Sequence, residues 1–176
     1  MQIKPSTTAD IPEIFRLYRL ATAYQKVQFP GNQWPEFERK LIEDEIAQQR
    51  QFKMLIEDKV ACIWAIAYKD PELWKADDGI SALYIHRIAT NPDFRGNNYV
   101  KSIVEWARGF ARDKKYIRMD TCGDNQRLIQ HYKRCGFRFL GKQKLEDAGS
   151  LPAHYHNAEV CYFEIKLDQN SPDTVL

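Results

Sequence analysis

Predicted strands and helices alternate along this chain, and the alternation indicates a single domain of mixed α/β class. β-rich runs bounded by turn residues occupy 53–68, 80–90 and 116–122. Helical periodicity of apolar residues begins near residue 10 and again near residue 97. A chain of 176 residues is long enough for one substantial core. We therefore expect one domain over residues 1–168 and a flexible tail over 169–176.

Composition excludes several classes of protein. Hydrophobic residues make up 44% and charged residues 28% of the chain, as in folded globular proteins. The 26 basic and 24 acidic residues leave a net charge of +2, which gives no general attraction to nucleic acid. No apolar run approaches the ~18 residues of a membrane span, and the N-terminus lacks a secretory signal pattern. We expect neither a nucleic-acid nor a membrane partner, and we interpret Lys114, Lys115 and Arg118 as a solvated helix end rather than a basic patch.

The spacing of the cysteines indicates a reducing compartment. They are scattered along the chain with no C-x-x-C pair, at Cys62, Cys122, Cys135 and Cys161. Free thiols in a cytoplasmic protein explain this spacing better than a disulfide framework does.

The first third of the chain is expected to form a short edge strand and two helices. Residues 2–5 give the strand, and Thr8 or Asp10 marks the start of a helix. The inner face of this helix would carry Ile11, Ile14, Phe15, Tyr18 and Thr22. After a break at 29–32, an acidic second helix is expected over about 36–49. Its acidic side chains form either a solvated face or a wall that attracts a cationic amine.

The middle of the chain is expected to form a hairpin, a loop and a long strand. Two apolar runs within 53–68 are separated by a charged turn, which predicts the hairpin. A loop then spans 70–79 and a strand spans 80–90. Asn91-Pro92 ends this strand, because proline lacks the amide hydrogen that a sheet requires.

The segment after this strand has the pattern of a phosphate-binding site. A helix is expected from Asn97, because apolar residues recur there at helical spacing: Tyr99, Ile103, Trp106 and Phe110. A strand that leads through a loop into a helix presents free amide donors and the positive end of the helix dipole. Arg95, just before Gly96, would add a charge-assisted contact. An Arg-Gly pair before a helix is weak evidence on its own.

A further strand and helix follow this segment. The strand is predicted over 116–122, and Asp124 or Asn125 is expected to cap the next helix. This helix would end before Gly136, where a left-handed glycine is favoured. Tyr132 lies within it and, taken alone, would be a packed structural residue.

Together these two segments resemble the GNAT superfamily of N-acetyltransferases, in which acetyl-CoA is the acyl donor. Residues 88–96, with the sequence I-A-T-N-P-D-F-R-G, are similar to the loop before that family's pyrophosphate-binding turn. Residues 125–137, with the pattern N-x-x-L-x-x-x-Y-x-x-x-G-F, resemble its second signature. The motifs cover about 88–141, and the order of elements over 2–167 also fits.

The resemblance implies a mixed, mostly antiparallel central sheet of about seven strands with helices on both faces. In such folds two neighbouring central strands, here 81–90 and 116–122, splay apart at one end. The pantetheine arm of acetyl-CoA would lie in that gap and pair with the backbone of the first strand. The residues that the resemblance assigns to acetyl-CoA are Ile88, Ala89, Thr90, Arg95, Gly96, Asn97, Asn98, Tyr99, Val100, Lys101, Asn125 and Tyr132.

Acetyl transfer requires a group that takes a proton from the amine and a group that gives one to the departing thiolate. The resemblance assigns the second role to Tyr132 and a contact with the cofactor arm to Asn125. A backbone amide at Ile88 or Ala89 would stabilise the carbonyl oxygen. A homodimer is common in this family and is one of the open alternatives for the oligomeric state.

His86 is the first candidate for the base. Tyr84 and His86 alternate with Ile88, so the three side chains are expected to share one face of the sheet. A histidine with a pKa of about 6.5 accepts a proton directly or through water. A hydrogen-bonded structural histidine is the alternative. Glu57 and Glu45 are lesser candidates.

The loop departs from the family pattern (Gln/Arg)-x-x-Gly-x-(Gly/Ala), because Asn98 and Val100 occupy the two small positions. Asparagine tolerates left-handed backbone angles, whereas the β-branched Val100 adds bulk where the backbone should approach phosphate. Two functions therefore stand. One is an N-acetyltransferase that moves the acetyl group of acetyl-CoA directly to a primary amine of a small molecule or peptide. The other is a catalytically weak or inactive CoA-binding or partner-binding module on the same fold.

No metal site is expected, since His154 and His156 lack a third ligand at suitable spacing.

Overall fold

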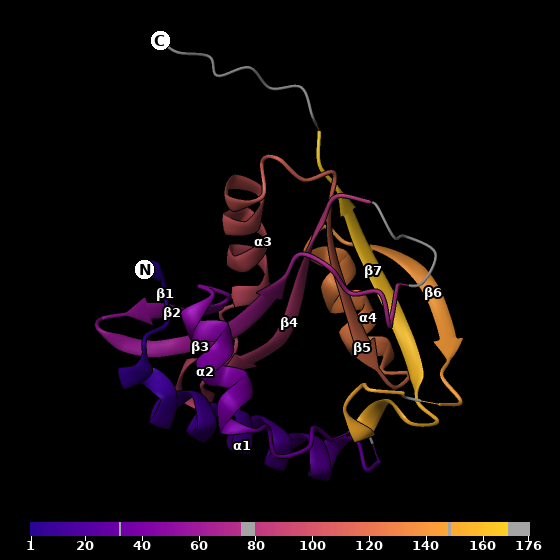
Figure 1. The fold of residues 1–176 in the computed structure, drawn as a ribbon, viewed down its shortest axis with the longest axis horizontal. Coiled ribbons are helices and arrows are strands. Elements are labelled where there is room, and N and C mark those ends of the chain that lie inside the picture. Colours follow the sequence, from indigo (N-terminus) through magenta and orange to yellow (C-terminus); the bar gives the residue numbers. More distant parts are fainter. Residues whose placement is uncertain (32, 75–79, 148, 169–176) are drawn as a thin grey trace.

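A seven-stranded sheet forms the centre of the computed structural model, which describes residues 1–31, 33–74, 80–147 and 149–168 (Figure 1). The strands are β1 (Gln2–Pro5), β2 (Gln51–Ile56), β3 (Lys59–Ala67), β4 (Ala82–Thr90), β5 (Tyr116–Cys122), β6 (Arg138–Lys144) and β7 (Glu159–Lys166). Their order across the sheet is β1-β2-β3-β4-β5-β7-β6. All neighbouring pairs are antiparallel except β4 and β5, which are parallel. The expected mixed, mostly antiparallel sheet is confirmed, while the tail predicted over 169–176 lies outside the described residues.

Helices cover both faces of the sheet, as expected. They are α1 (Ile11–Gln28), α2 (Arg39–Ala47), α3 (Tyr99–Phe110) and α4 (Gln126–Arg134), with single 3-10 turns at Thr8–Asp10, Pro92–Phe94 and Ala153–Tyr155. α3 and α4 pack on one face, in a core cluster that includes Trp64 and Phe163. α1 and α2 pack on the other face, around Ile63 and Ala89. Ile63 and Trp64 are neighbours in β3 and serve opposite cores, because successive strand residues point to opposite faces.

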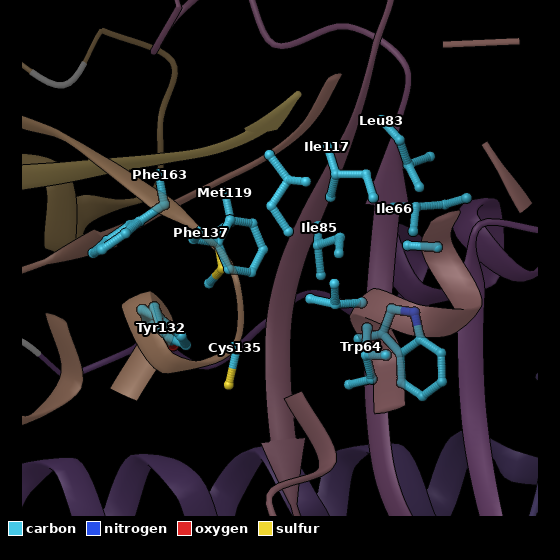
Figure 2. Close-up of a cluster of buried hydrophobic side chains, with 14 of the residues drawn as sticks. Trp64, Ile66, Leu83, Ile85, Ile117, Met119, Tyr132, Cys135, Phe137 and Phe163 are labelled. Atoms are coloured by element: carbon cyan, nitrogen blue, oxygen red, sulfur yellow. The ribbon is translucent and has the colours of Figure 1, made fainter. Parts of the chain in front are cut away.

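The core beneath α3 and α4 holds aromatic rings at its α4 end (Figure 2). The Tyr132 ring meets that of Phe163 edge to face, with 5.1 Å between the centroids, and Phe137 lies beside both. Trp64 is fully buried at the other end, with Trp106 of α3 against it at 5.3 Å. These contacts fix both helices against the sheet.

The inward face of α3 is rotated relative to the predicted stripe. Tyr99 and Ile103 are buried as expected, but Phe110 is 41% exposed. Val104 and Ala107 are buried instead. Close packing over a sheet brings small residues inward, while the larger rings at the helix edge cover the core from the side.

β4 and β5 stay paired over a short stretch only. Residues Ala82 to Tyr84 pair with Tyr116 to Arg118, and beyond this point β5 keeps its partner on the other side, β7, along its whole length. β4 likewise remains paired with β3 as far as Thr90. The two strands therefore diverge toward the end of the sheet that α1 crosses (Figure 1), as the resemblance implies.

A bulge in β4 changes which side chains face the opening. Ala65 pairs with His86 and Ile63 pairs with Ala89, so β4 has one residue more than β3 between these points. Arg87 takes up the extra residue with a positive φ of 51°. Ile88 consequently packs in the core beneath α3 and α4, opposite to Tyr84 and His86. The expectation that all three side chains share one face is wrong, because alternation does not continue through a bulge.

Among the described helices, none combines the length and the apolar character that crossing a membrane would require.

Candidate active site

The divergence of β4 and β5 opens a cavity of about 1310 Å³. Its walls come from both strands, the loop before α3, the start of α4 and the C-terminal half of α1. All the residues predicted to contact acetyl-CoA line this cavity except Lys101. The amide of Lys101 donates to the carbonyl oxygen of Asn98 at 3.0 Å and is therefore engaged within the turn.

The loop before α3 lines the cavity and has left-handed backbone angles at two positions. Gly96 has a φ of +89°, and a Cβ at this position would meet no atom within 4 Å. Asn98 caps the helix with left-handed angles, φ 52° and ψ 48°, which asparagine adopts more readily than most residues. Val100 packs against the core beneath α3, so that core accommodates its β-branched side chain. The loop thus provides open space and a helix N-terminus, the two features that a pyrophosphate requires.

Arg95 connects this loop to α1. Its guanidinium carbon lies 4.4 Å from the centroid of the Tyr24 ring, a cation–π contact between two exposed side chains. The contact places a permanent positive charge at the mouth of the cavity, beside the amides of the loop. This arrangement suits a ligand with negative phosphate groups.

α4 brings its two predicted residues to the same cavity. The side-chain oxygen of Asn125 accepts a hydrogen bond from the amide of Leu128 at 3.1 Å and caps the helix. Tyr132, two turns later, is 9% exposed and lines the cavity. Burial, together with nearby Cys135 and Asp120, raises the pKa of its phenol well above the usual range. The phenol is therefore protonated at neutral pH, the form in which it can donate a proton.

Three titratable side chains of the cavity lining form a cluster. Asp70 follows β3, His86 lies in β4 and Asp120 lies in β5, and one donor atom from each lies within 4.8 Å of the other two. Asp70 Oδ2 is 3.6 Å from His86 Nε2. The Tyr155 hydroxyl donates to Asp120 Oδ2 at 2.7 Å. The separation is small enough for one cation to contact all three groups.

The pKa values in this cluster are displaced in opposite directions. Burial, Asp120 and Glu72 raise the pKa of Asp70 to about 7, and burial raises that of Asp120 to about 6. Burial and the charges of Arg87 and Arg50 lower the pKa of His86 to about 3. His86 is thus uncharged across the neutral range despite its acidic neighbour.

The other candidate bases are placed less favourably. Glu45 lines the cavity, but it forms a buried ion pair with Arg87. Glu57 lies in the turn between β2 and β3 and does not line the cavity. His154 lines the cavity with a pKa lowered to about 4, mainly by burial, whereas His156 does not line it.

The acidic second helix is mostly a solvated face. Its charges are engaged in exposed ion pairs that join Glu43 to Arg39, Asp44 to Lys40 and the preceding Glu36 to Arg19. The alternative, a wall that attracts a cationic amine, has little free charge to support it.

Asp70 and Asp120 were not identified from the sequence. Asp120 carried one signal, a carboxyl group in the middle of a β-rich run that was expected to be a central strand. Asp70 carried none, because an Asp-Pro pair at the start of a loop is ordinary turn chemistry.

Comparison with known proteins gives the family of the chain. The profile of the acetyltransferase (GNAT) family matches residues 14–137. An uncharacterized N-acetyltransferase, YesJ of Bacillus subtilis, is 31% identical over 74 residues, a match that covers 41% of this chain and 41% of that protein.

Solved structures agree with the family profile. A GNAT-family acetyltransferase from Listeria monocytogenes superimposes with a TM-score of 0.73 at 22% identity, covering 94% of both chains. The yncA protein of Salmonella typhimurium, solved with its cofactor acetyl-CoA, gives a TM-score of 0.66 at 12% identity and covers 99% of this chain and 98% of its own. The family profile and the fold lead to one conclusion: the chain belongs to the acetyltransferase (GNAT) family of acetyl-CoA-dependent acyltransferases.

Proposed function

We propose that this chain transfers the acetyl group of acetyl-CoA directly to a primary amine of a small molecule or peptide. The observation that carries the proposal is the position of Tyr132, a protonated phenol that lines the same cavity as the loop before α3. A phosphate-binding loop alone would support cofactor binding only. A proton donor beside it supports chemistry at the far end of the same ligand.

The residues around the cavity have separate roles in this proposal. The amides of Gly96 to Val100 and the guanidinium of Arg95 hold the pyrophosphate. The edge of β4 between His86 and Thr90, which has no β5 partner, pairs with the pantetheine arm. Acetyl-CoA supplies the activated acetyl group. An amide at Ile88 or Ala89 stabilises the developing negative charge on the carbonyl oxygen, and Tyr132 protonates the departing sulfur.

The non-catalytic alternative loses part of its support. It was motivated by Asn98 and Val100 in place of small residues. Asn98 has the left-handed backbone that a glycine would provide, and Val100 has a place in the core. We therefore favour an active enzyme.

Calorimetry with acetyl-CoA, followed by a thiol-release assay with a panel of primary amines, tests the proposal. We expect saturable binding and amine-dependent release of CoA. Binding without release for any amine would support the non-catalytic module, and absence of binding would contradict both functions.

Two further expectations belong to this proposal. All four cysteines are free thiols, which supports a cytoplasmic location because that compartment is reducing. The homodimer that is common in this family stays a prediction, which light scattering can test.

A further inference from the structure

The cluster of Asp70, His86 and Asp120 lies where the sheet opens. Tyr84 and Arg118 form the last pair between β4 and β5. His86 follows Tyr84 by two positions, and Asp120 follows Arg118 by two positions. Two positions along a strand return to the same face, so both side chains point to the same side of the sheet. Asp70 completes the cluster from the segment after β3. The cluster therefore spans the gap between the diverging strands.

Negative charge in this cluster lacks a compensating partner. The Asp70 side chain is 10% exposed, and its buried Oδ2 has no hydrogen-bond partner. Asp120 accepts a hydrogen bond from the hydroxyl of Tyr155 and one from a backbone amide, and neither donor carries a charge. Within the described part of the chain, neither carboxyl group is in ion-pair contact with a lysine or arginine. A buried carboxylate without a partner is costly, so the cluster is suited to a proton or a cation.

Arg87, whose charge acts on His86, is engaged with groups outside the cluster. Arg87 binds Glu45, contacts the Tyr18 hydroxyl and lies over the Phe37 ring. Other groups that interact electrostatically with the cluster are Glu72, Cys122, Tyr132 and Tyr162, and His154 lines the same cavity. Glu72 adds negative charge, and His154 is uncharged at neutral pH because its pKa is lowered to about 4.

We propose that Asp70 and Asp120 bind the ammonium group of the acceptor and act as the base of the reaction, with His86 as a positioning residue. The inference rests on the proposed function and specifies its substrate class: primary amines that arrive as cations. His86 is the candidate that the sequence favours, but burial beside Arg87 opposes a positive charge on its ring. Two neighbouring carboxyl groups that share one proton are better proton acceptors near neutral pH.

Protons balance in the proposed step. The carboxylate pair takes one proton from R–NH3+, and the nitrogen lone pair of R–NH2 then forms the C–N bond to the acetyl carbon. The C–S bond breaks, and the sulfur receives the proton of the Tyr132 hydroxyl. The second proton lost by the nitrogen restores Tyr132, and the pair releases its proton to solvent. The products are R–NH–acetyl, CoA-SH and one H+.

The first test does not depend on turnover. Carbon-13 NMR of the aspartate carboxyl groups follows the titration of Asp70 and Asp120 in the full chain. We expect both to titrate well above an ordinary aspartate, and n-butylammonium, but not neutral n-butanol, to move their titration to lower pH. Ordinary aspartate titration, or an equal response to n-butanol, would overturn the ammonium site. It would leave the proposed function untouched.

The second test uses isosteric variants. Asp70→Asn and Asp120→Asn should each lower kcat/KM for n-butylamine at pH 7 on the order of 100-fold, the usual range for a proton-transfer group. Acetyl-CoA affinity measured by calorimetry should stay unchanged, which separates this inference from cofactor binding. Asp113→Asn is the matched control, because Asp113 is exposed and pairs with Lys114 at the surface. It should leave kcat/KM unchanged.

The pH profile distinguishes a base from a positioning residue. In the wild type, kcat/KM should fall as pH drops through the titration of the pair. Asp120→Asn removes a like charge from Asp70, so its residual activity should persist to lower pH than that of the wild type. His86→Gln should lower kcat/KM and leave the acid limb of its pH profile at the same pH as in the wild type. Full activity in both asparagine variants, with loss of the acid limb in His86→Gln, would assign the base to His86 and overturn the inference.

A metal ion is the remaining occupant to test. Metal analysis of the purified protein and activity after treatment with a chelator should show neither a stoichiometric divalent ion nor a chelator-sensitive rate. A bound ion that activity requires would overturn the inference, because the carboxylates would then be occupied by the ion.

Discussion

The thiol of Cys135 donates a hydrogen bond to the side-chain oxygen of Asn98 at 3.3 Å, and this contact joins the end of α4 to the cap of α3. Tyr132 lies one turn before Cys135 in the same helix. The helix that carries the proposed acid and the proposed pyrophosphate loop are therefore in direct contact. A change in the backbone angles of the Asn98 turn is expected to affect both.

Asn98 should tolerate glycine but not alanine. Its left-handed backbone is natural for glycine, so Asn98→Gly should change the free energy of unfolding by about 0.5 kcal/mol or less. Asn98→Ala keeps the backbone angle and adds the cost of a left-handed non-glycine residue, about 1–2 kcal/mol. Urea titration measures both values. Equal stability of the two variants would contradict the left-handed cap.

Val100 should matter for stability more than for cofactor binding. Val100→Gly removes a side chain that packs against the core and places glycine in the first turn of α3. We expect a loss of about 1–3 kcal/mol in the free energy of unfolding, with little change in acetyl-CoA affinity of the folded protein. Tighter binding in this variant would show that the valine obstructs the loop.

Gly96→Asp should weaken acetyl-CoA binding by more than tenfold, which is about 1.4 kcal/mol. The aspartate adds negative charge beside the phosphates and adopts the φ of +89° only with strain. Gly109→Asp is the matched control, because Gly109 also faces open space but has an ordinary φ and lies at the far end of α3. Calorimetry should show weaker acetyl-CoA binding for Gly96→Asp and unchanged binding for Gly109→Asp.

Tyr132→Phe should lower kcat by about 10- to 1000-fold, overlapping the range of proton-transfer contributions. The ring contacts with Phe163 and Phe137 survive, so stability and acetyl-CoA affinity should change little. Tyr68→Phe serves as the control, since Tyr68 is 46% exposed. Unchanged turnover in Tyr132→Phe would make Tyr132 a packing residue.

Asp70→Asn should stabilise the protein at high pH and lose that advantage at low pH. The pKa of Asp70 is raised to about 7 in the folded state, above the value of about 3.9 for an unfolded aspartate. The folded state therefore binds more protons between these values, and wild-type stability rises as pH falls from 8 toward 4. Unfolding measured at pH 8 and pH 5 checks this. An equal difference between variant and wild type at both pH values would contradict the raised pKa.

Local chemistry made much of the fold predictable. β1 and β5 have the predicted bounds, and Asn125 caps α4 as its side chain and position indicate. The acidic second helix is shorter than expected, Arg39–Ala47, since Glu38 before it has an extended backbone with a ψ of 140°. β6 was not predicted as a separate strand. Most of its side chains are exposed, and its strand conformation comes from pairing with β7.

The sequence by itself determined the motifs: the loop ending at Gly96, the helix that carries Tyr132, and the family they indicate. Only the tertiary structure decided which side chains meet in the cavity. The bulge at Arg87 reverses the facing of Ile88, and the divergence of β4 and β5 brings Asp120 beside Asp70, fifty residues away in the chain. Local propensity determines caps and turns, whereas the register between strands and the burial of a carboxyl group depend on neighbours that are distant in sequence.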